Sequence, residues 1–296
     1  MLGLELREHG VIAVIVGDDG EVRARAEADG SSGLAEAAID VLDRVAGSCQ
    51  GDLSLGVSST SPESATTAAV LAALRPRYAD ALNSGGVMAS GTAAALAEAW
   101  CGAARTVRDV VYFGVAEHAT AGIVRGGVAV TGAHGRAPAV AWLALNPVER
   151  EDYRRTGCLQ AEAAAAGIVR RLVWRIKAGD RSGIENMVNG DLTKITVEHL
   201  LEGARHDDGV AISVVRDTAK YLGMAAANLV AVTDPEVLVV GGLLASAADL
   251  FLEPLRTEIT RRLPANMMHA LTIVPAALGA DAAAIGAARP AAAATR

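Results

Sequence analysis

A pair of glycines at the end of a short apolar strand is the feature of the sequence best suited to holding a ligand. Gly241 and Gly242 follow Val237–Val240, whose unbroken apolar run is typical of a strand covered on both faces. The next predicted helix, Ala245–Thr260, begins just beyond, and a helix N-terminus reached through glycines favours a phosphate or a nucleoside. The alternative is a glycine turn that serves packing alone, and this stretch by itself favours neither interpretation.

Two further groups of polar side chains could do chemistry, and each has a simpler explanation. Ser58–Pro62 is a hydroxyl-rich loop that could bind a small polar ligand, but Ser61 is also a good cap for the predicted helix Glu63–Leu74. Glu117 and His118 could form an acid–base pair, yet no third partner is evident in the sequence. An exposed turn is the favoured interpretation of that pair.

Two stretches of the C-terminal half resemble the ROK family, which contains repressors and sugar kinases. DPEVLVVGGLLASAADLFLEPLR, at Asp234–Arg256, is similar to the adenosine-loop region of the family, and PAALGADAAAIGAA, at Pro275–Ala288, is similar to its last strand and closing helix. The resemblance runs over nearly the whole chain. It implies an α/β, two-lobed actin-like ATPase or sugar-kinase fold, related to ribonuclease H, with Gly241, Gly242 and Gly122 on the nucleotide side.

The catalytic motif of the family is altered at its general base. VMASGTAAALAE, at Val87–Glu98, resembles the family pattern N-D-x-N-A-A-A-L-A-E, in which the Asp takes the proton from a sugar hydroxyl. The matching places Ser90 at that Asp and Thr92 at the following Asn. A serine hydroxyl is not a base near neutral pH, and losing a general base ordinarily costs roughly 10²–10⁴-fold in rate. We therefore expect no catalytic residue, with Asp109 or Glu98 as a displaced base in the alternative.

The two phosphate-binding loops that the family possesses are also altered. The D-I-G-G-T-K type loop corresponds to ELREHG at Glu5–Gly10, where bulky and acidic side chains replace glycines and oppose the approach of phosphate. Arg7 and His9 could bind an anion, but solvated hairpin side chains are the favoured interpretation. The G-T-G-x-G-G-G loop corresponds to AEHATAG at Ala116–Gly122, which keeps one glycine, Gly122.

The sugar and zinc motifs of the family retain few of their functional side chains. GAHGRAPAVAW, at Gly132–Trp142, resembles G-A-x-G-x-A-G-E-x-G-H, with Ala139 at a sugar-binding Glu and Trp142 at a His that binds sugar and zinc. Of the loop C-x-C-G-x-x-G-C-x-E only GCLQ, at Gly157–Gln160, remains. Because one thiolate cannot hold tetrahedral zinc, we expect no metal site, and Cys158 as a small buried side chain. Trp142 is expected in the core, or alternatively stacked on a ligand.

The composition excludes several classes of protein. The chain has 296 residues and a net charge of −7, which argues against binding nucleic acid or anionic lipid directly. Cys49, Cys101 and Cys158 share no close spacing, so we expect a reducing compartment and no disulfide framework. The sequence shows neither a signal peptide nor a run long and apolar enough to span a bilayer, which predicts a cytoplasmic protein.

The elements that would position these residues are short strands and amphipathic helices arranged in two lobes. We expect lobes at residues 1–105 and 106–288, followed by a frayed tail at 289–296. The predicted strands are Leu2–Leu6, Gly10–Val16, Asp52–Val57 and Asp109–Val115, and a hairpin runs over Gly122–Val130. The predicted helices include Gly33–Val45, Glu63–Leu74, Gln160–Arg175, Asp191–Gly203, Val210–Lys220 and Tyr221–Val232.

An apolar stretch in the second lobe suggests self-assembly. Leu172, Val173, Trp174 and Ile176 lie together, and Met187–Val188 follows closely. Because an exposed apolar patch invites aggregation, burial in a symmetric homodimer is one solution. In ROK proteins, helices of this region pack against a partner chain. The alternative is that these side chains fill the core of their own lobe.

Together the altered motifs predict a catalytically inactive ROK-fold protein that acts by binding a small molecule or by homo-oligomeric assembly, regulatory in sugar metabolism. No cofactor is expected, with ATP or ADP as the alternative. A second hypothesis is an active ATP-dependent hexose or N-acetylhexosamine kinase with a displaced base. A third is the effector domain of a transcriptional regulator that needs a separate DNA-binding partner. Fold resemblance alone does not choose among them.

Overall fold

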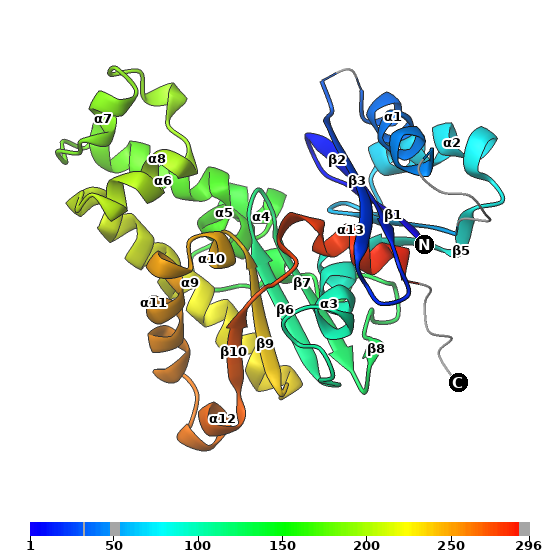
Figure 1. Cartoon of the computed structure of the whole chain (residues 1–296). Helices are drawn as coiled ribbons and strands as arrows, with labels where there is room; N and C mark the ends of the chain where they lie inside the picture. The colour runs from blue at the N-terminus through cyan, green and yellow to red at the C-terminus, as the bar shows by residue number, and fades with distance from the viewer. Residues whose placement is uncertain (32, 48–53, 290–296) are drawn as a thin grey trace. The chain divides into compact units, whose positions relative to one another are not determined.

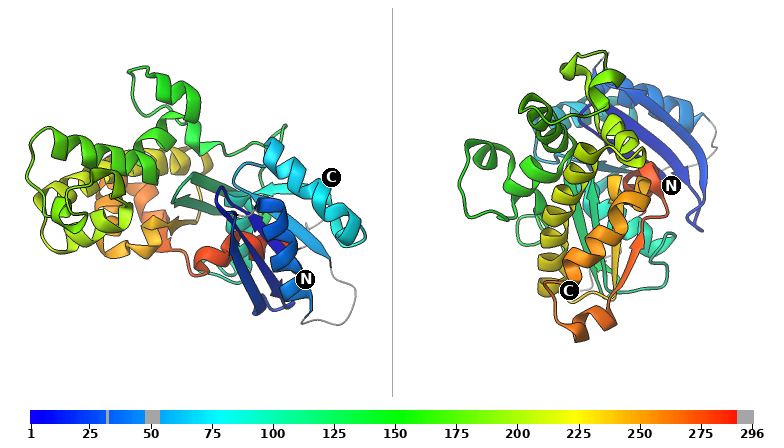
Figure 2. Two further views of the ribbon diagram at one scale, coloured as in Figure 1. Left: turned by 90° about the horizontal axis from the view of Figure 1, so that it is seen from above. Right: turned by 90° about the vertical axis from the view of Figure 1, so that its left-hand side faces the viewer.

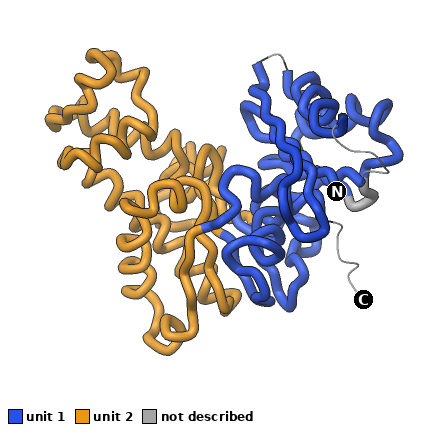
Figure 3. Tube along the Cα trace, viewed as in Figure 1, with its two compact units in different colours: residues 1–112, 121–138, 276–296 blue, residues 113–120, 139–275 orange. Residues whose placement is uncertain are grey.

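The structure is a computed structural model that describes residues 1–31, 33–47 and 54–289. These residues form two compact units, which Figure 3 distinguishes by colour. Unit 1 comprises residues 1–112, 121–138 and the segment from Ala276 onward, and unit 2 comprises residues 113–120 and 139–275. The predicted lobes at residues 1–105 and 106–288 stay a prediction. Cys49 and residues 290–296 of the predicted tail lie outside the described residues.

Unit 1 contains a five-stranded mixed sheet, labelled in Figure 1. Its strand order is β3-β2-β1-β4-β5. Strand β2 pairs antiparallel with both β1 and β3, and β4 pairs in parallel with both β1 and β5. The strands are β1 (Leu2–Leu6), β2 (Gly10–Val16), β3 (Val22–Asp29), β4 (Leu55–Ser59) and β5 (Leu82–Ala89). The first two strands confirm the prediction. The predicted strand Asp52–Val57 corresponds to β4, which runs on to Ser59. The first two residues of the predicted strand lie outside the described ranges.

Apolar side chains cover both faces of this sheet. One face packs against α1 (Leu34–Ala46) and α2 (Ala65–Tyr78), and the other against α3 (Ser90–Trp100) and α13 (Ala282–Ala288). Successive side chains of a strand point to opposite faces, so β2 contributes to both layers. Val11, Ala13 and Ile15 lie on the first, and Ile12, Val14 and Val16 on the second. Figure 2 gives two further views of the ribbon.

Helix α13 lies directly on β1 and β4 because both strands present glycine to it. A methyl group on Gly3 would lie 2.0 Å from the carbonyl oxygen of Ala284, and one on Gly56 would lie 1.7 Å from that of Ala287. Neither distance is physically attainable, so a side chain at either position would push the helix away from the sheet.

A second five-stranded sheet has the order β10-β9-β6-β7-β8. Its strands are β6 (Val110–Val115), β7 (Ala119–Arg125), β8 (Val128–Ala129), β9 (Val237–Gly242) and β10 (Thr272–Pro275). In unit 2, β9 and β10 pair in parallel. In unit 1, β7 and β8 form the predicted antiparallel hairpin, and its turn residues Gly126 and Gly127 have φ of 58° and 84°. Glycine adopts such angles without strain.

Unit 2 is largely helical and is organised around α9 (Gly209–Thr233). The two predicted helices Val210–Lys220 and Tyr221–Val232 are this one continuous helix, because neither Gly nor Pro separates them. The other elements are η1 (Val140–Trp142), α4 (Glu151–Thr156), α5 (Cys158–Ala163), α6 (Ala165–Lys177), α7 (Ile184–Met187), η2 (Leu192–Lys194), α8 (Val197–Arg205), α10 (Leu243–Ser246), α11 (Ala248–Thr260) and α12 (Ala265–Ala270), with η3 (Gly279–Asp281) in unit 1. No helix of the described ranges is long and apolar enough to cross a membrane.

Several predicted helix boundaries are wrong. The predicted helix Gln160–Arg175 is divided into α5 and α6 at Ala164, whose ψ of 163° is extended. The predicted helix Ala245–Thr260 is divided into α10 and α11 at Ala247. Ser61 does not cap α2, because that helix begins later and the hydroxyl of Ser64 accepts the hydrogen bond from the backbone of Thr67 at 3.1 Å.

Three of the six apolar side chains predicted as an interface lie in the core, and Val173 is half-buried. Leu172 and Ile176 of α6 are buried, as is Val188, because these side chains point into unit 2. Trp174 and Met187 remain, with 67% and 39% of their surfaces exposed. The alternative interpretation therefore holds for three of these positions, and only two large side chains are left to form an exposed surface.

Candidate functional site

The predicted base position opens helix α3 in unit 1. Ser90 is the first residue of α3, directly after β5, and is 5% exposed. No side chain caps this helix, since its N-cap residue is Ala89. Within the described residues, the buried hydroxyls of Ser90 and Thr92 have no hydrogen-bond partner. An unsatisfied buried polar group is costly, so the start of α3 is a place where a polar ligand atom would be stabilising.

A second polar group, which the sequence analysis did not single out, lies beside Ser90. Glu5 of β1 is 5% exposed, and its Oε2 accepts hydrogen bonds from Nε and Nη2 of Arg7 at 3.0 and 2.9 Å. The same Nη2 donates to the carbonyl of Ala280 at 2.5 Å. The signal was available, because Glu5 aligns with the acidic first residue of the phosphate-loop motif. Its guanidinium partner now lies at the position of the missing glycines.

Burial dominates the electrostatics of Glu5. It raises the pKa of this carboxyl above its ordinary value, and the charge and hydrogen bonds of Arg7 partly oppose that effect. The Ser90 hydroxyl lies near enough to lower the pKa slightly as well, although it makes no hydrogen bond of normal geometry. Nearby Tyr112 is also buried, and desolvation together with the charges of Glu5 and Glu98 raises its pKa. The site is therefore a desolvated carboxylate neutralised by an internal cation.

The two carboxylates proposed as displaced bases hold backbone in place. Glu98 is fully buried, and its oxygens accept backbone N–H bonds from Ala103 at 2.7 Å, Leu278 at 2.9 Å and Ala277 at 3.2 Å. Asp109 accepts the N–H of Gly126, at the turn between β7 and β8, at 2.8 Å. Oxygens engaged in this way stabilise loops, and they are poorly placed to take a proton from a ligand.

Packing accounts for two of the three glycines assigned to a nucleotide. A methyl group on Gly122 would lie 2.2 Å from the carbonyl oxygen of Gly91, and one on Gly242 would lie 2.4 Å from that of Val115. Gly242 also has a φ of 60°, which disfavours other residues. Gly241 is a buried residue of β9. A role of these glycines in nucleotide binding stays a prediction.

In unit 2, the turn that replaces the second phosphate loop is fastened by Gln160 of α5. Its Oε1 accepts the N–H of Ala119 at 2.7 Å, and its Nε2 donates to the carbonyl of Glu117 at 2.8 Å. The same Nε2 lies 3.3 Å from Nδ1 of His118. The N–H of Ala165 adds a backbone bond to the carbonyl of Ala116 at 2.9 Å. The turn is thus held from both sides by protein atoms.

The residues matched to the family's sugar and zinc motifs differ in how exposed they are. Trp142, in η1, is 56% exposed, so its predicted place in the core is wrong, and its stacking on a ligand stays a prediction. Ala139 is exposed at the start of η1. Cys158 is buried against Tyr153 and Ala161, as predicted. Within the described ranges, no group of three or more His, Cys, Asp or Glu side chains has an arrangement that could hold a metal ion.

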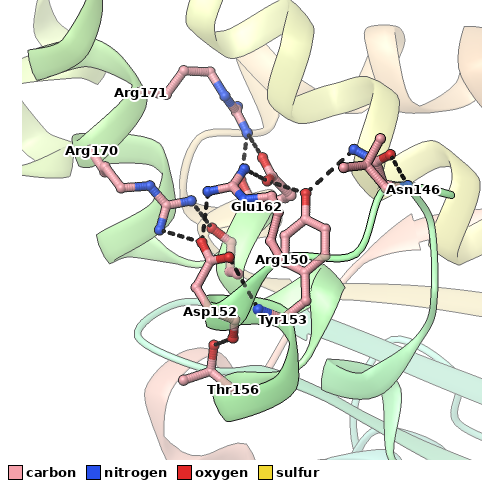
Figure 4. A network of polar contacts seen from close by, with 10 residues as sticks. Asn146, Arg150, Asp152, Tyr153, Thr156, Glu162, Arg170 and Arg171 are labelled. Carbon is pink, nitrogen blue, oxygen red and sulfur yellow. Dashed lines mark hydrogen bonds and ion pairs between the residues drawn. The ribbon is translucent and has the colours of Figure 1, made fainter.

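Charged side chains form a network around Glu162 on the same short helix α5 (Figure 4). Oε1 of Glu162 accepts hydrogen bonds from Tyr153 at 2.5 Å and Arg150 at 2.9 Å, and its Oε2 accepts one from Arg171 at 2.8 Å. Asp152 accepts a hydrogen bond from Arg150 at 2.7 Å and forms an ion pair with Arg170 at 3.2 Å. These contacts join α4 to α5 and α6, in the region where the family motif has its cysteine-rich loop.

Comparisons with known proteins place these observations among relatives of two kinds. A model of the ROK family matches residues 88–293. A glucokinase from Halalkalibacterium halodurans is 30% identical over 198 residues, which cover 65% of this chain and 59% of that protein. A putative xylose repressor from a Caldicellulosiruptor species is 31% identical over 60% of this chain and 44% of that protein. The matches thus span less than two thirds of these curated relatives.

Solved structures with a similar fold include both an enzyme and a regulator. A ROK family glucokinase from Streptomyces griseus, in complex with glucose and AMPPNP, superposes with a TM-score of 0.79 at 21% identity over 97% of each chain. A ROK family transcriptional regulator superposes with a TM-score of 0.78 at 19% identity over 97% of this chain and 76% of that one. At these identities the likeness concerns the fold.

Proposed function

Since the chain belongs to the ROK family, we propose that it is a catalytically inactive member that binds a small molecule and assembles with itself. Its mixed α/β fold is that of the actin-like sugar kinases of the family. Its relatives include both kinases and repressors, so family membership supports a sugar kinase or a regulator equally. The choice between them rests on the residues of this chain.

The observation that carries the proposal is the base position. Phosphoryl transfer to an alcohol needs a group that accepts the hydroxyl proton as the phosphoryl group arrives. Ser90 stands at that place, and the carboxylates of Glu98 and Asp109 are bonded to backbone amides. Glu5 is paired with Arg7. No carboxylate among these three is poised to replace the missing Asp.

The altered phosphate loops support the same conclusion. A polyphosphate needs close approach to backbone N–H groups and a positive local potential. In unit 1 the first loop carries Arg7, whose guanidinium is occupied by Glu5 and Ala280. In unit 2 the backbone of the second turn is bonded to Gln160. We accordingly propose that neither loop cradles phosphate, that no ATP is consumed and that no structural zinc is held.

An active kinase is the second candidate, and one observation favours it. Glu5 is a buried carboxylate close to Ser90, and burial raises its pKa toward the range useful for a general base. Release of Arg7 would leave this carboxylate to take a proton in place of the missing Asp. The similarity to glucokinases is consistent with this alternative. The regulator alternative is supported by the similarity to repressors, and it would need a DNA-binding partner because of the net charge of −7.

The experiment that separates these proposals is an assay of ATP-dependent phosphorylation with glucose, mannose and their N-acetyl amines. We expect no turnover above background for the purified chain. Turnover with any of these sugars that disappears in Glu5→Gln would overturn the inactive assignment in favour of the kinase. A thermal-shift screen against the same sugars and nucleotides, with and without Mg²⁺, detects binding independently of turnover. Elemental analysis that finds about one zinc per chain would contradict the proposed lack of metal.

The proposed setting is the cytoplasm. Free thiols suit a reducing compartment, and within the described residues Cys101 and Cys158 are both free. We propose no direct contact with nucleic acid or membrane.

A further inference from the structure

Two side chains of helix α5 in unit 2, two residues apart, make contacts with different parts of the chain. Glu162 collects charges from α4 and α6, and Gln160 fastens the turn Glu117–Ala119. We propose that α4 and the loop before it form an ionic strap, whose attachment to Glu162 sets the conformation of the turn through Gln160. The inference concerns the unliganded chain, so it holds or fails independently of the proposed function.

The strap is defined as residues 146–156, and its side-chain contacts to Glu162 come from Arg150, just before α4, and from Tyr153 within it. Arg150 bridges Glu162 and Asp152, and the Tyr153 hydroxyl donates to Glu162 while Asn146 lies 3.4 Å from the same hydroxyl. The guanidinium of Arg150 also stacks over the ring of Tyr153, 4.9 Å from its centroid. Figure 4 shows Arg150 and Tyr153 pointing toward the carboxylate of Glu162, while Asp152 contacts Arg150 and Asn146 contacts the Tyr153 hydroxyl.

Apolar contacts contribute little to this attachment. Tyr153 is the single buried residue of α4, and it packs in a small cluster with Cys158, Ala161 and Leu145. A six-residue helix is too short to be stable alone. The position of α4 therefore depends mainly on the charged groups around Glu162, which makes it responsive to ionic strength.

The ion pairs of the strap differ in how strongly salt screens them. The side chains of Arg150 and Arg170 are 42% and 48% exposed, whereas those of Glu162 and Arg171 are 7% and 16% exposed. Exposed pairs are screened as the Debye length falls from about 10 Å at 0.1 M salt to about 3 Å at 1 M, and buried pairs much less. Salt should therefore loosen α4 first, while Glu162 stays attached to α6 through Arg171.

The link from the strap to the turn is short. Gln160 precedes Glu162 by two residues on α5, and a shift of this helix must move both side chains. Three hydrogen bonds attach the turn to α5 and α6. The N–H of Ala119 donates to Gln160, the side chain of Gln160 donates to the carbonyl of Glu117, and the N–H of Ala165 donates to the carbonyl of Ala116. The bond to Ala119 is partly buried and the bond to Glu117 is exposed, so the two bonds restrain the turn only while Gln160 keeps its position. A loosened strap should therefore expose the amides of the turn.

The test is amide hydrogen exchange on the full chain, comparing Glu162→Gln with Asp249→Asn. The control removes the charge from Asp249, which accepts two hydrogen bonds from Arg205 elsewhere in unit 2. We expect Glu162→Gln to raise exchange by about tenfold in peptides covering the strap and in those covering residues 116–120. The control should leave both unchanged. In the wild-type chain, 1 M NaCl should raise exchange in the strap.

Each other outcome contradicts part of the proposal. If Glu162→Gln speeds exchange in the strap but leaves residues 116–120 protected, the coupling through Gln160 is wrong. If neither segment responds, the strap is not held by charge. Should Glu162→Gln fail to fold, Asp152→Asn tests the same attachment from the exposed side, and an unchanged strap in that variant overturns the proposal. Gln160→Ala should expose the turn while the strap stays protected.

Discussion

At the scale of single residues, one internal cation decides what the site in unit 1 can do. Arg7 places its guanidinium on Glu5 and on the carbonyl of Ala280. Burial raises the pKa of the Glu5 carboxyl, and the charge and hydrogen bonds of Arg7 oppose that rise. Ser90, whose hydroxyl has no hydrogen-bond partner within the described residues, lies close enough to Glu5 to affect its pKa.

The raised pKa of Glu5 predicts how stability depends on pH. The unfolded chain loses this proton at a lower pH than the folded chain, so the folded state binds more protons in the window just above pH 4.5. Stability contributed by this group is then lost as pH rises through that window. Glu5→Gln should remove the dependence, so the wild-type chain should become less stable relative to the variant between about pH 4 and pH 7.

Urea unfolding of both chains across that range measures the difference. Glu36→Gln, on the exposed side of α1, controls for the substitution itself. A stability difference between wild type and Glu5→Gln that stays level from pH 4 to pH 7 would show that burial does not penalise the charged Glu5.

The residues of this site were only partly predictable from the sequence. The substitution at Ser90 is visible in the motif. The pairing of Arg7 with Ala280 joins positions 273 residues apart in the chain, and no local pattern encodes such a contact. The exposure of Trp142 was missed for a similar reason, since apolar character predicts burial on average but not for a single residue.

At the scale of elements, periodicity predicted the strands and most helices, whereas their ends depended on tertiary contacts. Strands Leu2–Leu6 and Gly10–Val16 were predicted with the correct ends because turn residues bound them. The break at Ala164 was not predictable, because neither Gly nor Pro marks it and alanine favours helix. Both α5 and α6 pack against α9, a tertiary contact that no local pattern reports.

The N-cap of the longest helix gives a prediction for element stability. Asp208 accepts the N–H groups of Val210 and Ala211 at 3.0 and 2.9 Å, and its other oxygen accepts from Gly183 and Ser182. Asp208→Ala should cost about 1–2 kcal/mol of unfolding free energy at neutral pH, measured by urea denaturation.

The acidity of Asp208 provides the check on that prediction. Burial alone would raise its pKa, but the four hydrogen bonds together lower it below the ordinary value. Its contribution is therefore complete above about pH 4 and is lost as pH falls further, so wild type and Asp208→Ala should converge in acid. Asp191→Ala removes the cap of the three-residue η2 and should cost less. Equal losses in both variants would contradict the special role of Asp208.

Alanine substitution should have opposite effects on stability at two glycines, one packed under α13 and one in open space. Gly56→Ala forces a methyl group against the backbone of Ala287, which should destabilise the chain by more than about 2 kcal/mol. Gly209→Ala, at the start of α9, meets no atom within 4 Å and should stabilise it by about 0.4–1 kcal/mol. Thermal unfolding of both variants distinguishes them. A tolerated Gly56→Ala would mean that α13 can move off β4.

At the scale of the whole molecule, fold and motif have diverged to different extents. The family model begins its match at residue 88, whereas the fold of a ROK glucokinase matches 97% of the chain. The altered loop at Glu5–Gly10 lies in the part outside the family match. Core positions accept any apolar residue of suitable volume, so a fold outlasts the glycines and carboxylates that chemistry requires.

Assembly can be tested at the most exposed large aromatic side chain of unit 2. Trp174 is 67% exposed on α6, beside the basic side chains of Arg170 and Lys177. Burying an indole ring between two copies would remove a large apolar area from water, so we propose a homodimer in which Trp174 lies in the interface.

Light scattering at micromolar concentration should give twice the mass of one chain, and Trp174→Glu should reduce the measured mass to that of one chain. Val232→Glu, at a position 85% exposed on α9, should leave the dimer intact. A wild-type chain that already scatters as a monomer, or a dimer unaffected by Trp174→Glu in a folded protein, would rule out this interface.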